Sequence, residues 1–82
     1  NNYPNPFNPS TQINFELIES GKISIDIFNI KGKRVDRIID NEWYVSGAHS
    51  IAYHPSRIAS GNYFYRLKTR DRDLVKKLVY IK

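Results

Sequence analysis

The chain has 82 residues with no cysteine or methionine, 13 Lys plus Arg against 8 Asp plus Glu, 40% hydrophobic residues and 13% aromatic residues. This length allows one small core and no separate catalytic domain, and the lack of cysteine excludes disulfides, thiolate zinc sites and cysteine nucleophiles. No apolar run approaches the roughly 18 residues of a membrane span, and the start of the chain lacks the basic and apolar segments of a signal peptide.

The first residues differ in composition from the rest. Pro4, Pro6 and Pro9 favour extended backbone with few hydrogen bonds, so we expect residues 1–10 to form a lead-in arm and residues 11–82 to form one folded domain. The chain opens without an initiating methionine, which favours a piece cut from a longer protein.

Apolar residues then recur at every second position, which is the period of a half-buried strand. Residues 11–17 and 22–27 both show this alternation, with Lys22, Ser24 and Asp26 on the wet side of the second run. Gly21 lies between the two runs and can supply the positive φ of a tight connection, so the runs are predicted to pair as a hairpin.

The middle of the chain is less regular. Asn29 and Gly32 flank a predicted turn, and the apolar residues of 34–40 fit no single alternation, which predicts a β-bulge or a change of buried face. Residues 41–47 are expected to form a connection or a short edge strand before a strand over 48–53. The following Pro55 cannot donate to a sheet, so residues 54–60 are expected to form a crossing loop.

The C-terminal part holds the most aromatic run. Residues 62–69 alternate, with Tyr63, Tyr65 and Leu67 on one side, and a polar tip at 70–73 precedes the last strand. That strand is predicted from residue 74 to about 81, and its end is apolar on both faces, as expected for a strand that is covered on both sides.

Six or seven short strands separated by turn residues predict an all-β fold, an immunoglobulin-like antiparallel β-sandwich. The Cys-Trp-Cys pattern of antibody domains is absent. The predicted core consists of residues that share the inward side of their strands. They are Ile13, Phe15, Ile23, Ile25, Ile27, Ile51, Tyr65 and Leu67.

The net positive charge of the chain comes from the C-terminal hairpin. Residues 66–82 contain seven basic and two acidic side chains, a net charge of +5, whereas residues 1–65 balance to zero. Such a local field can steer an anionic partner, whether phosphate, acidic protein or lipopolysaccharide. The alternative is a solvated hairpin whose cations deter edge-to-edge aggregation. The candidate partner-binding residues are Lys76, Lys77 and Lys82, with Arg70 and Arg72 as supporting charges.

Nucleic acid is disfavoured as the partner. Tyr63 and Tyr65 are predicted to face the core, which leaves Phe64 alone as a platform for base stacking.

The residues give little support for catalysis or metal binding. His49 is expected to be a core or edge histidine, and His54 with Ser56 has no acid placed to orient it and no nucleophile elbow. The acidic pairs, Asp36 with Asp40 and Asp71 with Asp73, lack the ligand count of a calcium loop. The Asn8-Pro9-Ser10 sequence is disqualified as a glycan acceptor by its proline. We therefore expect no enzyme, no cofactor and no metal site.

Four separated blocks of the sequence carry a family resemblance. The blocks are Tyr3-Pro4-Asn5-Pro6-Phe7-Asn8-Pro9-Ser10-Thr11, Asn29-Ile30-Lys31-Gly32-Lys33-Arg34-Val35, Ile58-Ala59-Ser60-Gly61-Asn62-Tyr63-Phe64-Tyr65-Arg66-Leu67 and Lys76-Lys77-Leu78-Val79-Tyr80-Ile81-Lys82. In this order and spacing the chain resembles the C-terminal sorting domain of the type IX (Por) secretion system. The residues that carry the resemblance as structural motif positions are Pro4, Asn5, Pro6, Phe7, Gly32, Gly61, Tyr63, Tyr65 and Leu67.

The resemblance implies a non-catalytic immunoglobulin-like domain at the C-terminus of a larger exported protein. It also implies an N-terminal cargo domain in the same chain, which crosses the periplasm and reaches the cell surface or the medium. The implied partners are the outer-membrane translocon and a sortase-like cysteine protease that removes the domain and joins the cargo to lipopolysaccharide. The C-terminal block is where the resemblance places recognition.

Flagellar hook-capping proteins have an immunoglobulin-like domain with a similar start and a similar aromatic strand. The alternative function is therefore a structural module that assembles or spaces a surface structure. A small sandwich could do this by pairing its edge strand with that of a neighbour through backbone hydrogen bonds. Position in the open reading frame, and retention or loss of these residues in the mature protein, would separate a label from a scaffold.

Overall fold

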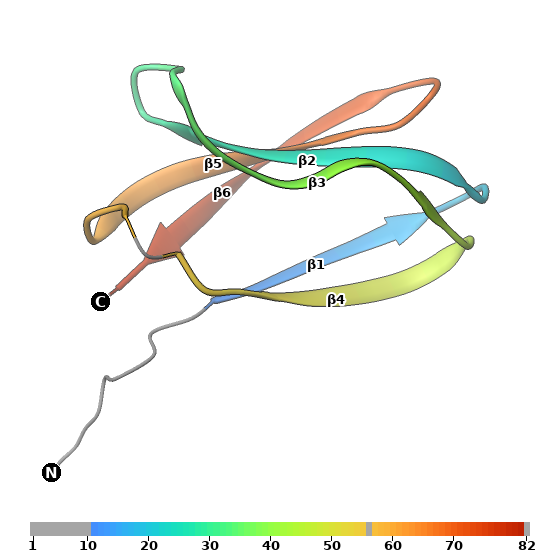
Figure 1. The fold of residues 1–82 in the computed structure, drawn as a ribbon, viewed down its shortest axis with the longest axis horizontal. Coiled ribbons are helices and arrows are strands. Elements are labelled where there is room, and N and C mark those ends of the chain that lie inside the picture. Colours follow the sequence, from blue (N-terminus) through green and yellow to red (C-terminus); the bar gives the residue numbers. More distant parts are fainter. Residues whose placement is uncertain (1–10, 56, 82) are drawn as a thin grey trace, which may run out of the picture.

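The alternating strands form two sheets that enclose one apolar layer (Figure 1). The computed structural model describes residues 11–55 and 57–81. In chain order the strands are β1 (Thr11–Leu17), β2 (Gly21–Asn29), β3 (Arg34–Tyr44), β4 (Gly47–Tyr53), β5 (Gly61–Lys68) and β6 (Asp73–Tyr80). β1 and β4 form one sheet, and the other four form the second sheet in the order β3-β2-β5-β6. All pairs are antiparallel, so the prediction of an all-β antiparallel sandwich is confirmed.

The predicted hairpin between the first two strands is wrong. β1 pairs with β4, from Thr11 opposite Tyr53 to Leu17 opposite Gly47, while β2 lies in the other sheet between β3 and β5. The connection between β1 and β2 therefore carries the chain from one sheet to the other. It needs no tight turn, and Gly21 is not among the residues with positive φ. Alternation identifies which face of a strand is buried, but it does not identify the neighbouring strand.

The expected turn and the expected irregularity are both present. Asn29 closes the turn, because its Oδ1 accepts from the backbone N–H of Lys31 at 2.9 Å and of Lys33 at 3.0 Å, and Gly32 has a φ of 85°. The β2–β3 pairing then shifts register at three places. β3 is longer than predicted and runs through residues 41–44, with Asn41 at a φ of 54°.

The core lies between the sheets. Every predicted core residue is buried except Ile51, which is half-buried and packs against the others. The complete set of buried apolar residues in the described chain is Ile13, Phe15, Leu17, Ile23, Ile25, Ile27, Ile39, Tyr53, Ile58, Tyr63, Tyr65, Leu67, Leu78 and Tyr80. The prediction that Tyr63, Tyr65 and Leu67 share the inward side of β5 is confirmed.

Buried tyrosine hydroxyls connect separate parts of the sandwich. Tyr53 of β4 donates to Asp36 Oδ2 of β3 at 2.6 Å, and Tyr65 of β5 donates to the carbonyl oxygen of Asn14 in β1 at 3.2 Å. Both bonds join one sheet to the other. Burial, together with the hydrogen bond to and the charge of Asp36, raises the pKa of Tyr53, and burial raises that of Tyr65. The rings fill the core, and their hydroxyls still find acceptors.

The last strand is not covered on both sides, so that prediction is wrong. β6 is the edge of the four-stranded sheet, with Leu78 and Tyr80 buried but Val79 52% and Ile81 76% exposed. A strand at a sheet edge with the core on one side presents its other side to solvent, whatever residues stand there.

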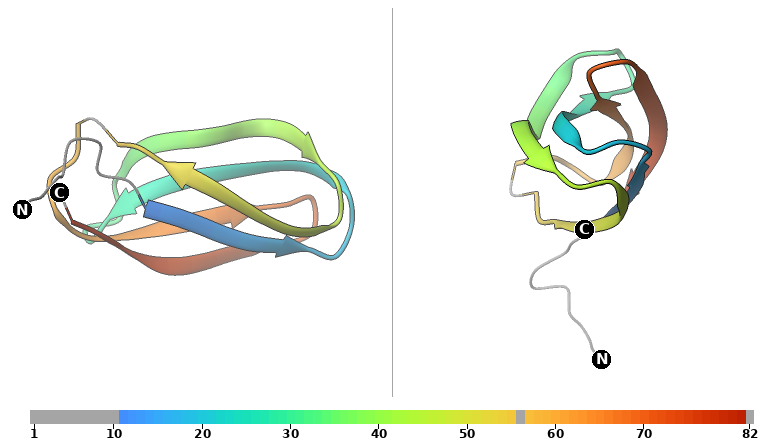
Figure 2. Two further views of the ribbon diagram at one scale, coloured as in Figure 1. Left: turned by 90° about the horizontal axis from the view of Figure 1, so that it is seen from below. Right: turned by 90° about the vertical axis from the view of Figure 1, so that its right-hand side faces the viewer.

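The two ends of the sandwich differ (Figure 2). Figure 1 and the left-hand view of Figure 2 place the start of β1 and the finish of β6 at one end, whereas the β1–β2, β3–β4 and β5–β6 connections gather at the opposite end. We call this opposite end the far end.

Replacing Ile25 by alanine should lower the free energy of unfolding by about 2–5 kcal/mol, because its fully buried side chain leaves a cavity in the core. Ile18→Ala is the matched control, since Ile18 is 76% exposed and should change stability by less than about 0.5 kcal/mol. Urea denaturation followed by circular dichroism measures both. Equal effects of the two substitutions would contradict this assignment of the core.

Candidate functional site

The predicted partner-binding residues do not form one surface. Lys76 and Lys77 are adjacent on β6, so alternation directs them to opposite sides of the sheet. Lys77 lies on the solvent side, opposite Phe64 in the register. Lys76 lies on the same side as Leu78, and it borders a shallow hollow with Phe15 of β1 and with β4. Both lysines are exposed.

Arg70 and Arg72 lie in the β5–β6 turn at the far end, away from both lysines, and Lys82 lies outside the described residues. Thr69 orders this turn. Its backbone N–H donates to the carbonyl oxygen of Arg72 at 2.8 Å, and its hydroxyl oxygen accepts from the N–H of Asp71 at 3.3 Å and of Arg72 at 3.1 Å. Arg70 and Arg72 are consequently presented to solvent from a hydrogen-bonded turn.

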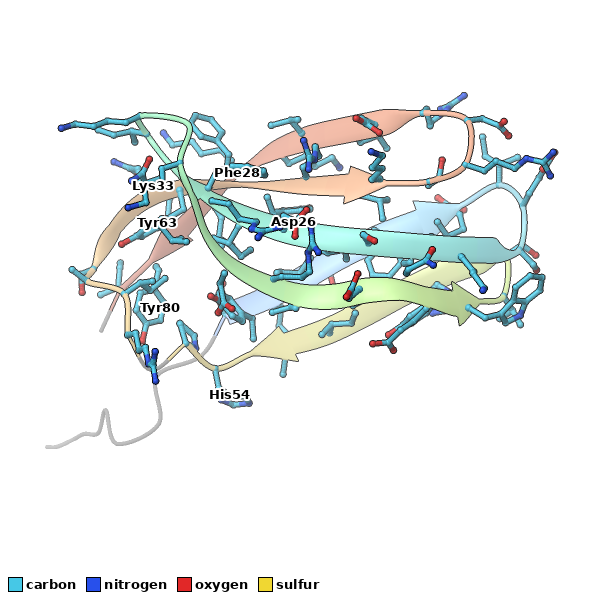
Figure 3. The ribbon with its side chains drawn as sticks, turned by 45° about the horizontal axis from the view of Figure 1, so that its top comes forward. Asp26, Phe28, Lys33, His54, Tyr63 and Tyr80 are labelled. Carbon is cyan, nitrogen blue, oxygen red and sulfur yellow. The ribbon has the colours of Figure 1, made fainter. Side chains whose placement is uncertain are left out.

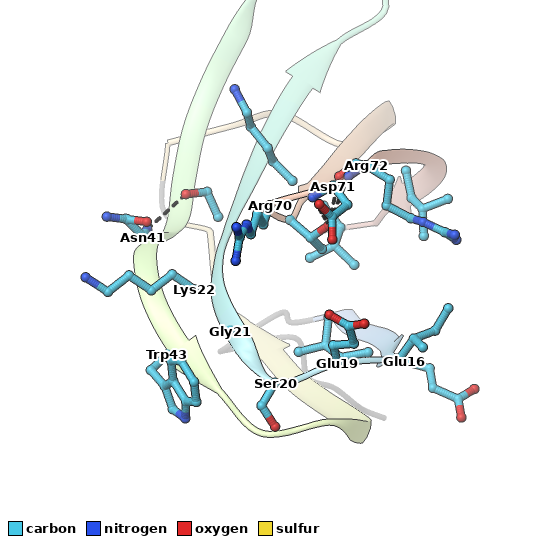
Figure 4. A pocket seen from close by; sticks show the side chains of 17 residues that line it. Glu16, Glu19, Ser20, Gly21, Lys22, Asn41, Trp43, Arg70, Asp71 and Arg72 are labelled. Carbon is cyan, nitrogen blue, oxygen red and sulfur yellow. Dashed lines mark hydrogen bonds between the residues drawn. The ribbon is translucent and has the colours of Figure 1, made fainter.

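A groove of about 710 Å³ opens beside this turn (Figure 4). Its walls are the β1–β2 connection, the end of β3 and the β5–β6 turn, and Arg70 and Arg72 both line it. Trp43 and Ile18 also line it and are 64% and 76% exposed. The charges around the groove have both signs, since Glu19 and Asp71 stand among the cations. The sequence predicted a connection or a short edge strand around Trp43, which lies in β3, and did not identify it as a site residue, although it is the only tryptophan in the chain.

A second cluster lies on the solvent side of the four-stranded sheet, around Asp26 of β2 (Figure 3). Asp26 is 1% exposed because arginine side chains from the neighbouring strands cover it. Arg37 Nε donates to Asp26 Oδ1 at 2.7 Å, Arg66 donates to Oδ2 at 3.1 Å, and Arg34 reaches within 4.0 Å of Oδ1. The guanidinium carbon of Arg66 lies 4.9 Å from the centre of the Phe28 ring.

The strand register extends this cluster to β6, so that it spans four strands. Phe28 of β2 stands opposite Phe64 of β5, Phe64 stands opposite Lys77 of β6, and Arg66 stands opposite Val75. Residues opposite one another in antiparallel strands share a side of the sheet. We call the combined surface the outer patch. It consists of Arg34, Arg37, Arg66, Lys77, Asp26, Phe28, Phe64, Val75 and Val79.

The electrostatics of the patch favour a charged Asp26. Burial alone would raise the pKa of its carboxyl group, but the hydrogen bonds from Arg37 and Arg66 and the positive charges of Arg37 and Arg34 outweigh burial and lower it below 3.8. The same contacts, chiefly the hydrogen bond to Asp26, raise the pKa of Arg37.

Two expectations from the sequence are corrected here. Asp26 was predicted on the wet side of its strand. It does lie on the solvent side of the sheet, but the arginines bury it. Phe64 was predicted to stand alone, but Phe28 lies beside it. This cluster can be recognised only once the strand pairing is known, because the two arginines that bind Asp26 are 11 and 40 residues away from it in sequence.

The described residues among the predicted motif positions lie in a turn, at a strand start and in the core. Gly32 lies in the β2–β3 turn and Gly61 begins β5, while Tyr63, Tyr65 and Leu67 belong to the core. Pro4, Asn5, Pro6 and Phe7, and with them the proposed arm, lie outside the described residues.

No arrangement for catalysis is present among the described residues. His49 is half-buried, stacks on Phe15 with ring centres 5.2 Å apart, and donates from Nε2 to the carbonyl oxygen of Val45 at 2.7 Å. Asp36 accepts from Tyr53, and Asp40 pairs with Arg37 at 3.5 Å. Within residues 11–55 and 57–81 no three His, Asp or Glu side chains gather as metal ligands, and no helix there has the length and hydropathy to span a bilayer.

Comparison with known protein families identifies a match. The family model described as the secretion system C-terminal sorting domain matches residues 1–82. The search of curated proteins and the search of solved structures returned no match.

Asp26→Asn should lower the free energy of unfolding at pH 7 by about 1–3 kcal/mol, because the arginines lose their counter-charge. The folded-state pKa of Asp26 lies below its unfolded value, so its contribution is complete above about pH 4 and is lost as the pH falls through the folded pKa. The difference between wild type and variant should therefore narrow at low pH.

Urea denaturation at pH 7 and at pH 2 to 3 measures this difference. Asp71→Asn is the control, since Asp71 is exposed and should change stability by less than about 0.5 kcal/mol. A difference that stays constant over this pH range would show that the charge of Asp26 contributes nothing.

Proposed function

The chain belongs to the family of secretion system C-terminal sorting domains, and we propose that its cationic β5–β6 hairpin is the part that the type IX secretion machinery recognises. A domain of this family is a non-catalytic signal for type IX secretion, and it marks proteins exported to the cell surface or the medium. Interaction with the secretion machinery follows from that role. The family membership favours the sorting label over the surface scaffold.

The charge distribution supports recognition through the hairpin. The net charge of +5 on residues 66–82 has no counterpart in residues 1–65. The four described candidate residues are all exposed, so their charges can attract a partner from solution. They are Lys76, Lys77, Arg70 and Arg72. A field of this kind accelerates encounter with an acidic partner and orients it.

The arrangement of the ends supports a further part of the proposal. We propose that a cargo domain precedes this domain in the same chain, that both cross the periplasm together, and that a sortase-like protease separates them at the outer membrane. β1 begins at the end of the sandwich opposite the far end (Figure 2). Cargo joined ahead of β1 would leave the β5–β6 turn and the solvent side of the sheet free for the machinery.

Self-assembly through the edge of β6 is less favoured. Lys76 lies on the core side of this edge strand, and an inward-facing charge on an edge opposes pairing with another strand. This observation favours a domain that stays separate from its copies.

Residues 1–82 fused behind a periplasm-directed reporter should carry that reporter to the surface or the medium of a bacterium with a working type IX system. In a strain that lacks the translocon the reporter should stay in the periplasm. Cell fractionation and immunoblotting measure this, and the mass of the exported reporter reports removal of the domain. Retention in the periplasm of both strains would contradict the sorting function.

Reversing two hairpin charges, Lys76→Glu with Lys77→Glu, should reduce export of the reporter by roughly tenfold or more, since the net charge of residues 66–82 falls by four from +5 to +1 and the electrostatic steering of an acidic partner weakens. The control is Lys31→Glu with Lys33→Glu, which makes the same charge change at exposed positions of the β2–β3 turn. Thermal unfolding of the purified fusions verifies folding. Equal export of both double variants would contradict recognition through the hairpin.

A further inference from the structure

We propose that the outer patch is a docking surface for an acidic protein surface of the secretion machinery, one that presents an apolar area beside its carboxylates. The inference rests on the proposed function and adds to it a second surface, the contact chemistry and the residues. It concerns the solvent side of the four-stranded sheet, of which the cationic hairpin supplies Lys77, Arg66, Phe64, Val75 and Val79.

The β6 side of the patch is largely apolar although it faces solvent. Val75 is 60%, Val79 52% and Phe64 37% exposed. Val75 and Val79 lie two positions on either side of Lys77, on the same side of β6, and Phe64 stands opposite Lys77. These side chains add nothing to the core, which lies on the other side of the sheet. Apolar residues gathered on a solvent-facing surface and bordered by polar groups are typical of an interaction site.

The arginines beside this apolar area are already ordered. Asp26 fixes Arg37 and Arg66 through hydrogen bonds of 2.7 and 3.1 Å, and Arg66 also lies over the Phe28 ring. Each guanidinium has five N–H donors, and their side chains are still 40% and 33% exposed. Donors therefore remain for a second acceptor, and binding one costs less side-chain entropy than ordering a free arginine.

The charge balance of the patch selects an acidic partner. Four cations (Arg34, Arg37, Arg66 and Lys77) face two carboxylates (Asp26 and the neighbouring Asp40, which pairs with Arg37). The surplus of two positive charges stays at the surface, because Arg34 is 49% exposed and Lys77 is exposed. Carboxylates of a partner would match these guanidinium groups in a bidentate geometry.

The mixture of groups favours a protein over a polyanion. A phosphate-rich polymer or glycolipid headgroup would use the cations but leave Val75, Val79 and Phe64 without apolar contact. Aromatic and arginine side chains beside an apolar area are the groups that dominate binding energy between proteins.

The test is export of the reporter fusion with Val75→Glu, compared with Val45→Glu. The two valines are matched, since they are 60% and 59% exposed, but Val45 lies in the β3–β4 connection outside the patch. We expect Val75→Glu to reduce surface reporter by roughly tenfold, because the new carboxylate would face the carboxylates of an acidic partner, and Val45→Glu to leave it within about twofold of wild type. The unfolding temperatures of the purified wild-type and variant fusions must agree within a few degrees. Val75→Thr adds no charge, so the fusion with this substitution should be exported more than the fusion with Val75→Glu.

The outcomes separate this inference from the sorting function. If the wild-type fusion is exported and both glutamate variants are exported equally, the outer patch is not the docking surface, while the sorting function stands. If the wild-type fusion stays in the periplasm, the sorting function itself fails.

The chemistry of the partner is tested in the same cells with a photocrosslinking residue at position 79 or, as the control, at position 45. We expect an adduct from position 79 that contains a translocon protein and maps to a peptide rich in Asp and Glu. An adduct with lipopolysaccharide, or equal adducts from both positions, would overturn the assignment to an acidic protein surface.

Discussion

The charged group at Asp26 is the interaction on which the four-stranded sheet depends. β2 lies between β3 and β5 in this sheet, with Ile25 and Ile27 fully buried on its core side and Asp26 buried on its solvent side. Arginines from β3 and β5 bind that one carboxylate. β2 therefore contacts its neighbours by apolar packing on the core side of the sheet and by ion pairs on the solvent side. A buried carboxylate is tolerated only with such partners, so the stability of the sheet depends on these partly exposed arginines.

The fold was predictable wherever the period-two pattern was unbroken. The bounds of β1 and the inward sides of β1, β2, β4 and β5 follow from alternation alone. Strand order does not, because two alternating runs present the same pattern whether they pair with each other or face each other across the core. This is why β2 was assigned to the wrong neighbour, and why residues 78–81 suggested a covered strand where the sheet in fact ends.

The candidate site was predictable only in part, for a similar reason. Charge counting identified the hairpin that carries Lys76, Lys77, Arg70 and Arg72. It could not show that Lys76 and Lys77 point to opposite sides of the sheet, or that the two arginines lie in the β5–β6 turn at the far end. The outer patch combines side chains from four strands of one sheet. No local segment holds more than a fraction of it, so pairing had to be known before Asp26, Phe28 and Phe64 could be seen as one surface.

The position of the chain ends also determines how the domain yields to mechanical force. The first residue of β1 and the last residues of β6 lie at the same end of the sandwich, and Thr11 and Tyr53 form the outermost pair of the β1–β4 sheet. A pull between those ends loads that pair first and then each following pair in turn, up to Leu17 and Gly47. Strands that open pair by pair resist much less force than strands that must slide past each other with all their hydrogen bonds loaded together. Force applied between these two ends therefore peels β1 from β4 and unfolds the domain at low force.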